Sequence, residues 1–415
     1  MTVATYSLPL TETFEPATQA ELVEIVQRAN AEGIPLYPIG GGTSLTAGAT
    51  NAPKGWGIST AQLTRVVDYP ARDMTITVES GLTMQALAEV LAVEQQRLPI
   101  DAPHPERATL GGVVATATSG PRRFGQGTIR DYVIGISAVD GRGVLFKAGG
   151  RVVKNVAGYD FCKLLTGSNG SLAIITQLTL KLRPLAEATA LVACNVTDFA
   201  QAETLLDSLV HSRVTPAAIE LLAGPAWDDN PLAGAPQNKH CAQLVVGLEG
   251  TTPEIDWMIG ELAQEWKELG VSAYRVISGE QTTGAWRRLT DFPAEESALL
   301  IKAGVLPSRV TQFIEAALAI APDCSIQSHA GSGVVYVRLP NFASQDAPAV
   351  LIRGFHPAAV KAGGAAIVLS CPVAHELTRP AFWGPARSDS ALMRGVKAQF
   401  DPKSLLNPGR AIFDN

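Results

Sequence analysis

Three consecutive glycines follow a short apolar run near the start of the sequence, in the segment YPIGGGTSL over residues 37–45. Glycine reaches positive φ without a Cβ clash, so successive amides can turn inward around an anion, and the hydroxyls of Thr43 and Ser44 add donors. The segment lacks the lysine of a nucleoside-triphosphate loop and the G-x-G-x-x-G spacing of a dinucleotide fold. It indicates a phosphate-cradling loop of another kind, with an ordinary glycine turn as the alternative.

A second run of small residues, ATLGGVVAT over 108–116, leads into Ser119 and Gly120. Two such surfaces can flank one long cofactor, because small side chains let a flat ring approach the main chain. Each glycine taken singly has another interpretation, which is close packing of backbone on backbone. Together the two clusters favour a ligand.

Composition limits the class of protein. The chain has 415 residues, with 33 basic and 39 acidic side chains and a net charge of −6, which does not favour nucleic acid as a partner. It is 46% hydrophobic and only 17% charged, typical either of surface buried against another subunit or of a large core. No apolar run approaches the roughly twenty residues of a membrane span, and the N-terminus lacks a signal pattern, so we expect a cytoplasmic protein.

The cysteines are scattered and share no C-x-x-C spacing, so they predict neither an iron–sulfur cluster nor a zinc site. We expect buried, reduced thiols. The five are Cys162, Cys194, Cys241, Cys324 and Cys371.

The elements around the first glycine cluster are the most clearly marked. A helix is expected over residues 18–31, where Thr18 and Glu21 form a capping box and Gly33 ends the helix. A strand over residues 35–39 then leads directly into the glycines. This order would place the anion-cradling loop at the end of a strand.

The elements up to about residue 95 indicate one α+β unit, those over 101–184 a second unit with a glycine-rich centre, and those after Pro184 a separate α+β domain. Before Pro184 we expect strands over 66–69, 74–78, 132–139, 143–147 and 174–181, and a helix over 83–95. After it we expect strands over 190–195, 243–248 and 298–305, and helices over 200–211, 253–269 and 308–320. Loops are expected over 222–240 and 371–388.

A series of motifs runs in order through residues 38–172: P-x-G-G-G-T-S, T-x-G-G, R-D before a strand, K-N-x-x-G-Y-D and G-S-x-G-x-L. This order resembles the FAD-binding domain of the vanillyl-alcohol oxidase, or p-cresol methylhydroxylase (PCMH), superfamily. The closing K-x-x-F-D-P and L-N-P-G segments, within residues 397–409, resemble those of FAD-linked 2-hydroxy-acid dehydrogenases. The segments SGPRR (119–123) and VKNVAGYD (153–160) are similar to the E-subunit family of bacterial glycolate oxidase, or glycolate dehydrogenase.

The resemblance implies an α+β fold of two domains. Residues 1–185 would form a PCMH-type FAD-binding domain of two α+β subdomains. Residues 186–415 would form an α+β FAD-linked oxidase C-terminal domain, or cap, whose tail over 391–415 returns to the flavin domain. The bound cofactor would be FAD.

The resemblance also implies which residues hold the FAD. Those around its pyrophosphate would be Pro38, Gly40, Gly41, Gly42, Thr43 and Ser44. Those along its middle and the isoalloxazine side would be Thr109, Gly111, Gly112, Thr116, Ser119 and Gly120. Gly170 and Ile174 would add backbone contacts, although a glycine before a strand and an apolar strand residue need no ligand.

Some members of the superfamily attach flavin covalently. They do so through a histidine at the position of Thr43, or through a cysteine near the second glycine cluster, where this chain has Ser119, Gly120 and Pro121. Since neither nucleophile is present, we expect noncovalent FAD.

The catalytic segment departs from the pattern. Active relatives carry H-x-G-D-G-N-x-H and a later E-H-G-x-G, which bring metal-ligating histidines and a base to the flavin. This chain keeps the first histidine as His329 but has Ser332, Val334 and Tyr336 in place of the Asp, the Asn and the second His. We therefore predict no metal site.

Other ionisable residues remain candidates without an assigned role. His329, His375 and Tyr159 are candidates for catalysis, with a structural or surface role as the alternative for each. The residues that could serve an anionic substrate or the cofactor, or only form surface ion pairs, are Arg122, Arg123, Arg130 and Lys154.

The function that follows is an FAD-binding oxidoreductase subunit of a glycolate (2-hydroxy-acid) dehydrogenase complex. A sister flavin subunit would oxidise the acid and an iron–sulfur subunit would take the electrons, either free in the cytoplasm or at the inner face of the membrane through those partners. One alternative is a self-sufficient FAD-dependent 2-hydroxy-acid dehydrogenase. The other is a scaffold subunit with an inactive flavin site.

Overall fold

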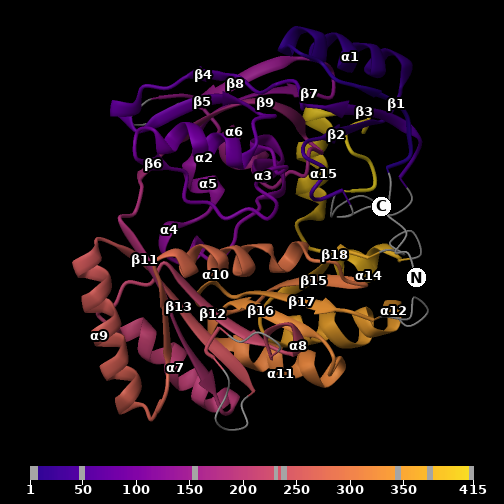
Figure 1. Cartoon of the computed structure of the whole chain (residues 1–415). Coiled ribbons are helices and arrows are strands. Elements are labelled where there is room, and N and C mark those ends of the chain that lie inside the picture. Colours follow the sequence, from indigo (N-terminus) through magenta and orange to yellow (C-terminus); the bar gives the residue numbers. More distant parts are fainter. Residues whose placement is uncertain are drawn as a thin grey trace.

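The computed structural model describes residues 8–45, 52–151, 158–228, 232–234, 241–341, 347–371 and 377–410. Figure 1 shows an N-terminal part above and a second part, based on one large sheet, below it. Helix α15 (Ser390–Phe400), near the end of the chain, lies with the upper part. The fold is α+β, as predicted. No described helix is long and apolar enough to cross a membrane.

The first sheet is parallel and carries the glycine loop at its edge. Its order is β1 (Leu10–Phe14), β3 (Gly55–Ser59) and β2 (Leu36–Ile39). Helix α1 (Gln19–Glu32) connects β1 to β2, and its apolar stripe is buried. The Thr18 hydroxyl accepts from the amide of Glu21, and Gly33 ends the helix at φ 71°. The Glu21 carboxylate accepts from Ala17 rather than from Thr18.

The second sheet is antiparallel and has five strands. Its order is β4 (Val66–Asp68), β5 (Thr75–Glu79), β9 (Ala173–Lys181), β7 (Val133–Asp140) and β8 (Leu145–Gly149). Its apolar face packs on short helices: α2 (Met84–Ala92), α3 (Leu110–Thr116), α5 (Ile129–Tyr132) and α6 (Phe161–Leu165). A short strand β6 (Gln96–Arg97) pairs with β10 (Arg183–Pro184), next to the crossing into the lower part.

The lower part is one antiparallel sheet of eight strands. Its order is β14 (Arg275–Ser278), β11 (Ala188–Val196), β13 (Ala242–Gly250), β12 (Ala218–Ala223), β16 (Ser325–His329), β17 (Val334–Leu339), β15 (Leu299–Gly304) and β18 (Ala365–Ser370). Helices on one face form the main core with it: α7 (Phe199–His211), α9 (Thr252–Glu268), α11 (Val310–Ile320) and α13 (His356–Lys361).

The other face of this sheet turns toward the upper part. Helix α10 (Glu280–Asp291) packs there, and in Figure 1 it lies between the sheet and the upper part. Strands in the middle of the sheet are therefore buried on both faces, as β12 is along its whole length. Buried strands of this kind lack the alternation of polar and apolar residues that marks a half-exposed strand.

Two sequence expectations were wrong in detail. The expected loop over 222–240 begins with the end of β12 and includes α8 (Pro225–Asp228). The expected loop over 371–388 includes α14 (Arg379–Trp383). Most of the second glycine cluster, for which no helix was expected, forms α3, and the Thr109 hydroxyl caps this helix by accepting from the Gly112 amide.

Candidate functional site

A cavity of about 580 Å³ lies between the upper part and the large sheet. The glycine loop and the start of α3 form one wall, the segment over 169–175 forms another, and strands β15, β17 and β18 supply the opposite side. The tail contributes Asn407 and Arg410. The cavity is therefore made by segments from both ends of the sequence.

Two glycines of the first cluster are required by packing. A Cβ on Gly41 would lie 1.6 Å from the carbonyl oxygen of Arg107, and one on Gly40 would lie 2.3 Å from Oγ1 of Thr109. Real Cβ atoms do not approach so closely, so only glycine lets the loop lie directly on the segment before α3. These glycines therefore allow the loop both to pack closely on the neighbouring backbone and to face a ligand.

The loop also offers unpaired donors. The structure gives the backbone amides of residues 40–45 no hydrogen bond to any described residue. Gly42 has φ +73°, the left-handed conformation that lets neighbouring amides converge. Backbone amides normally find partners, and these ones line the cavity, so they suit an anion such as a pyrophosphate.

Two guanidinium groups donate to carbonyl oxygens of the same loop. Arg410, buried with 6% of its surface exposed, donates to the carbonyl of Ser44 at 3.0 Å. Arg107 donates to the carbonyl of Gly41 at 3.5 Å. Both line the cavity, so positive charge accompanies the free amides. Arg410 directly follows the L-N-P-G motif, which is the signal by which it could have been selected from the sequence.

A buried lysine holds the tail in place. Lys397 Nζ donates to Oδ2 of Asp401 at 2.6 Å and to the carbonyls of Ser171 and Leu406 at 2.7 and 2.9 Å. Further along the tail, the backbone N–H of Asn407 donates to the backbone carbonyl of Leu36 at the start of β2. The tail is thereby joined to β2 and to the turn that precedes β9.

Asn407 presents an unpaired polar atom at the cavity. Its Nδ2 donates to the carbonyl of Asn169 at 2.5 Å, and its buried Oδ1 has no partner among the described residues. Orphaned buried acceptors are uncommon, and this residue lines the cavity, so a ligand donor group fits there.

The structure brings most of the expected cofactor residues to one cavity. Gly120 is the exception: it lies behind the wall, where a Cβ would come within 2.6 Å of the Cβ of Asp101. Gly170 has φ +66° and Ile174 is 1% exposed. The expected residues that line the cavity are Pro38, Gly40, Gly41, Gly42, Thr43, Ser44, Thr109, Gly111, Gly112, Thr116, Ser119, Gly170 and Ile174.

The two candidate catalytic residues that the structure describes, His329 and Tyr159, do not line this cavity. His329 is 2% exposed and does not line the cavity, and its Nδ1 lies 2.7 Å from Oε1 of Glu220. Burial raises the pKa of Glu220, although the charge and hydrogen bond of His329 oppose that rise. Tyr159 is 86% exposed at the surface. His375 and Lys154 fall outside the described residues.

The remaining arginines divide between surface and interior. Arg130 is exposed, and Arg123 donates to the Ser119 hydroxyl at 3.0 Å. Arg122 forms ion pairs in the interior at the junction between the two parts of the chain.

Sequence reasoning missed the ionisable residues on the cavity wall, because their strands and turns were not predicted or carried no motif. Tyr336, on β17, lines the cavity where the resembled pattern has its second histidine. The other ionisable lining residues are His104, Arg107, Glu295, Glu296, Lys302 and Arg410.

FAD fits this arrangement. Free amides, hydroxyls and two guanidinium groups meet the needs of a pyrophosphate, and the small residues of α3 leave room for a flat ring. When bound, FAD supplies hydride acceptance at its isoalloxazine ring. The protein itself would bind and orient the cofactor, and β15 and β17 would form the cavity wall that faces it.

Comparisons with known proteins match two domain families to the chain. The FAD binding domain family matches residues 12–149, and the family of FAD linked oxidases, C-terminal domain, matches residues 185–349 and 382–411. The solved structure of p-cresol methylhydroxylase with substrate bound has a TM-score of 0.76 at 14% identity, over 99% of this chain and 92% of that one. At this identity the likeness concerns the fold alone.

Curated relatives include both lactate and glycolate enzymes. D-lactate dehydrogenase of Archaeoglobus fulgidus is 26% identical over 96% of this chain and 90% of its own length. Glycolate oxidase subunit GlcD of Bacillus subtilis is 26% identical over 95% of this chain and 87% of its own length. Glycolate oxidase subunit GlcE of Escherichia coli is 39% identical over 29% of this chain and 34% of its own length. The two matched families together span most of the chain, which therefore belongs to the FAD-linked oxidases and is an FAD-dependent oxidoreductase related to glycolate oxidase and D-lactate dehydrogenase.

Proposed function

We propose that this chain is a flavin subunit of a glycolate, or 2-hydroxy-acid, dehydrogenase complex, and that its noncovalently bound FAD passes electrons toward partner subunits. A sister flavin subunit oxidises the acid in this scheme, and an iron–sulfur subunit accepts the electrons. The similarity to GlcE over 29% of the chain, together with the similarity to GlcD over 95% of it, supports a place in such a complex.

The position of Tyr336 carries the proposal. The cavity has this phenol where the resembled catalytic pattern has its second metal-ligating histidine. The first histidine of that pattern, His329, is engaged by the Glu220 carboxylate behind the wall. Compared with the resembled pattern, the residues expected to bind flavin are present while those expected to oxidise the acid are changed. This combination suits a subunit whose FAD relays electrons.

The cysteines support an external electron acceptor. Burial raises the pKa of Cys194 and of Cys324 to about 12, and that of Cys241, which also lies near Asp198, to about 11. These thiols stay protonated at neutral pH in the metal-free protein, and the described residues hold no cluster of three or more His, Cys, Asp or Glu side chains that could bind a metal ion. Electrons that leave the flavin would therefore pass to a cluster on a partner.

One observation favours a second candidate, a self-sufficient 2-hydroxy-acid dehydrogenase. Lys302 reaches the cavity from β15, with Nζ 5.8 Å from the ring centre of Tyr336. A cation beside a phenol can hold a small carboxylate, and the similarity to D-lactate dehydrogenase spans nearly the whole chain.

An anaerobic visible spectrum distinguishes these functions. The purified chain is recorded alone, after glycolate or D-lactate, and after addition of the candidate sister subunit. A relay predicts that the flavin band bleaches only with the sister subunit present. Bleaching by the acid alone would establish the self-sufficient enzyme, and a chain without a flavin band even after addition of FAD would indicate a scaffold.

A further inference from the structure

The segment over residues 118–126 joins the cavity wall to the large sheet. Thr118 and Ser119 line the cavity, and α4 (Arg123–Gln126) follows at once. The Gly125 amide at α4 donates to the carbonyl of Ala217 at 3.0 Å. The Phe124 ring lies against Gly331, where a Cβ would come within 2.4 Å of it. Movement of the sheet would therefore reach the wall through this segment.

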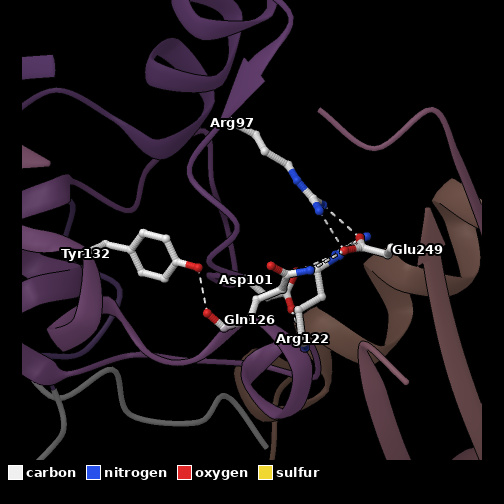
Figure 2. A network of polar contacts seen from close by, with 6 residues as sticks. All are labelled: Arg97, Asp101, Arg122, Gln126, Tyr132 and Glu249. Atoms are coloured by element: carbon white, nitrogen blue, oxygen red, sulfur yellow. Dashed lines mark hydrogen bonds and ion pairs between the residues drawn. The ribbon is translucent and has the colours of Figure 1, made fainter. Parts of the chain in front are cut away.

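Arg122 is the central residue of this junction (Figure 2). Its Nε donates to Oε1 of Glu249, on β13, at 2.6 Å, and its Nη1 donates to Oδ1 of Asp101 at 2.5 Å. Its own backbone amide donates to Oδ2 of Asp101 at 2.8 Å. The guanidinium also lies 3.8 Å from the ring centre of Trp286 on α10. One side chain thus contacts the upper part, the sheet and the helix between them.

Asp101 connects two stretches of the wall. Ala102 and Pro103, which follow it, line the cavity on one side, and Thr118 and Ser119 line it on the other. Its carboxylate accepts from both the side chain and the backbone of Arg122, so the spacing between these stretches depends on this pair.

A second arginine binds the same glutamate. Arg97 donates from both terminal nitrogens to the two oxygens of Glu249, at 2.8 and 2.7 Å (Figure 2). Two guanidinium groups thereby face the two carboxylates of Glu249 and Asp101, and the side chains of Arg97 and Arg122 are 18% and 17% exposed. Balanced, hydrogen-bonded charges at this depth hold a defined geometry.

We propose that Arg122 is a positioning residue, which fixes the Thr118–Ser119 wall of the flavin cavity by tying it to Asp101 and to Glu249 of the large sheet. The proposal rests on the assignment of this cavity to FAD. Arg97 shares the acceptor Glu249 and the burial of Arg122, and like Arg122 it does not line the cavity, but it lies on β6 and has no hydrogen bond to Asp101 among the described residues. It is a matched control for loss of the interdomain ion pair.

The experiment compares Arg122→Gln and Arg97→Gln in the full chain. FAD affinity is measured by titration of the flavin-free protein, and the band shape of the bound flavin and hydrogen exchange of residues 118–122 are recorded beside it. We expect the FAD dissociation constant to rise at least tenfold in Arg122→Gln and less than threefold in Arg97→Gln, with faster exchange in the first variant only. Equal changes in both variants, or unchanged binding in Arg122→Gln, would overturn the proposal.

Two further variants keep the proposal testable if Arg122→Gln does not fold. In that case, Asp101→Asn keeps the size and one acceptor of the carboxylate and is expected to weaken FAD binding in the same direction. Arg122→Lys keeps the positive charge but lacks the separate guanidinium nitrogens that donate to Glu249 and Asp101. Its FAD affinity should therefore be little higher than that of Arg122→Gln. Wild-type protein that binds no FAD would instead overturn the assignment of the cavity, and this proposal with it.

Discussion

Nδ1 of His329 lies 2.7 and 2.9 Å from the two carboxylate oxygens of Glu220, across the paired strands β16 and β12. Both side chains are nearly inaccessible to solvent. Gln327 adds a hydrogen bond to the same carboxylate at 2.8 Å. The histidine retained from the catalytic pattern thus has a buried structural partner.

His329→Leu should destabilise the protein by about 3 kcal/mol, because it leaves the Glu220 carboxylate buried without its charge partner. Urea unfolding of the wild type and the variant measures this difference. The double variant His329→Leu with Glu220→Gln should recover part of the loss. Unchanged stability in the single variant would show that the pair contributes little.

Gly41→Ala should abolish tight FAD binding, because the new methyl group would lie 1.6 Å from the Arg107 carbonyl and force the loop away. Gly395→Ala is the control: Gly395 lies in α15, where an added methyl group would meet no atom within 4 Å outside its own helix, and alanine favours a helix by up to about 1 kcal/mol. FAD titration and thermal unfolding are compared for both. Normal binding by Gly41→Ala would contradict the loop geometry.

Arg410→Gln should raise the FAD dissociation constant about tenfold, because a buried positive charge and a hydrogen bond to the Ser44 carbonyl are lost beside the loop. Arg28→Gln removes an arginine that pairs with Glu32 in the same helix and lies over the Trp56 and Phe14 rings, none of which lines the cavity, and it should leave the constant unchanged. Equal affinities for the wild type and Arg410→Gln would remove Arg410 from the cofactor site.

Glu249 should make stability fall in acid. Burial raises the pKa of this carboxyl, but the hydrogen bonds and charges of Arg97 and Arg122 outweigh it and hold the pKa below its usual value. Because the pKa of Glu249 is lower in the folded than in the unfolded protein, the carboxylate stabilises the fold at a pH above its unfolded-state pKa of about 4.3. This stabilisation is lost as the pH falls through the folded-state pKa.

Glu249→Gln tests this dependence. The variant should be less stable than the wild type at pH 7, by about 3 kcal/mol, and the difference should shrink below pH of about 4. Denaturant unfolding at several pH values measures both. Parallel stability curves for the two proteins would show that another group governs the acid response.

Flavin should leave the protein on acid precipitation, because Thr43 and Ser119 stand where covalently linked members of the superfamily carry a histidine or a cysteine. The absorbance of the supernatant and of the redissolved pellet measures the partition. Flavin retained in the pellet would show a covalent link and rule out noncovalent binding.

The local signals of the sequence determined the elements around the glycine loop. Thr18 and Gly33 bound α1 as expected, since capping and a left-handed glycine depend only on neighbouring residues. The two glycine clusters likewise indicated a phosphate-binding surface, because the backbone freedom of glycine belongs to the residue itself.

Only the tertiary structure decided the other side of the cavity. Strand β12 is buried along its whole length and has no alternating pattern, and β16 and β17 were missed for want of a local signal. Glu220 meets His329 across 109 residues, and Arg122 meets Glu249 across 127. Such partners are set by strand order and by the packing of one sheet on another part of the chain, which no local spacing of residues encodes.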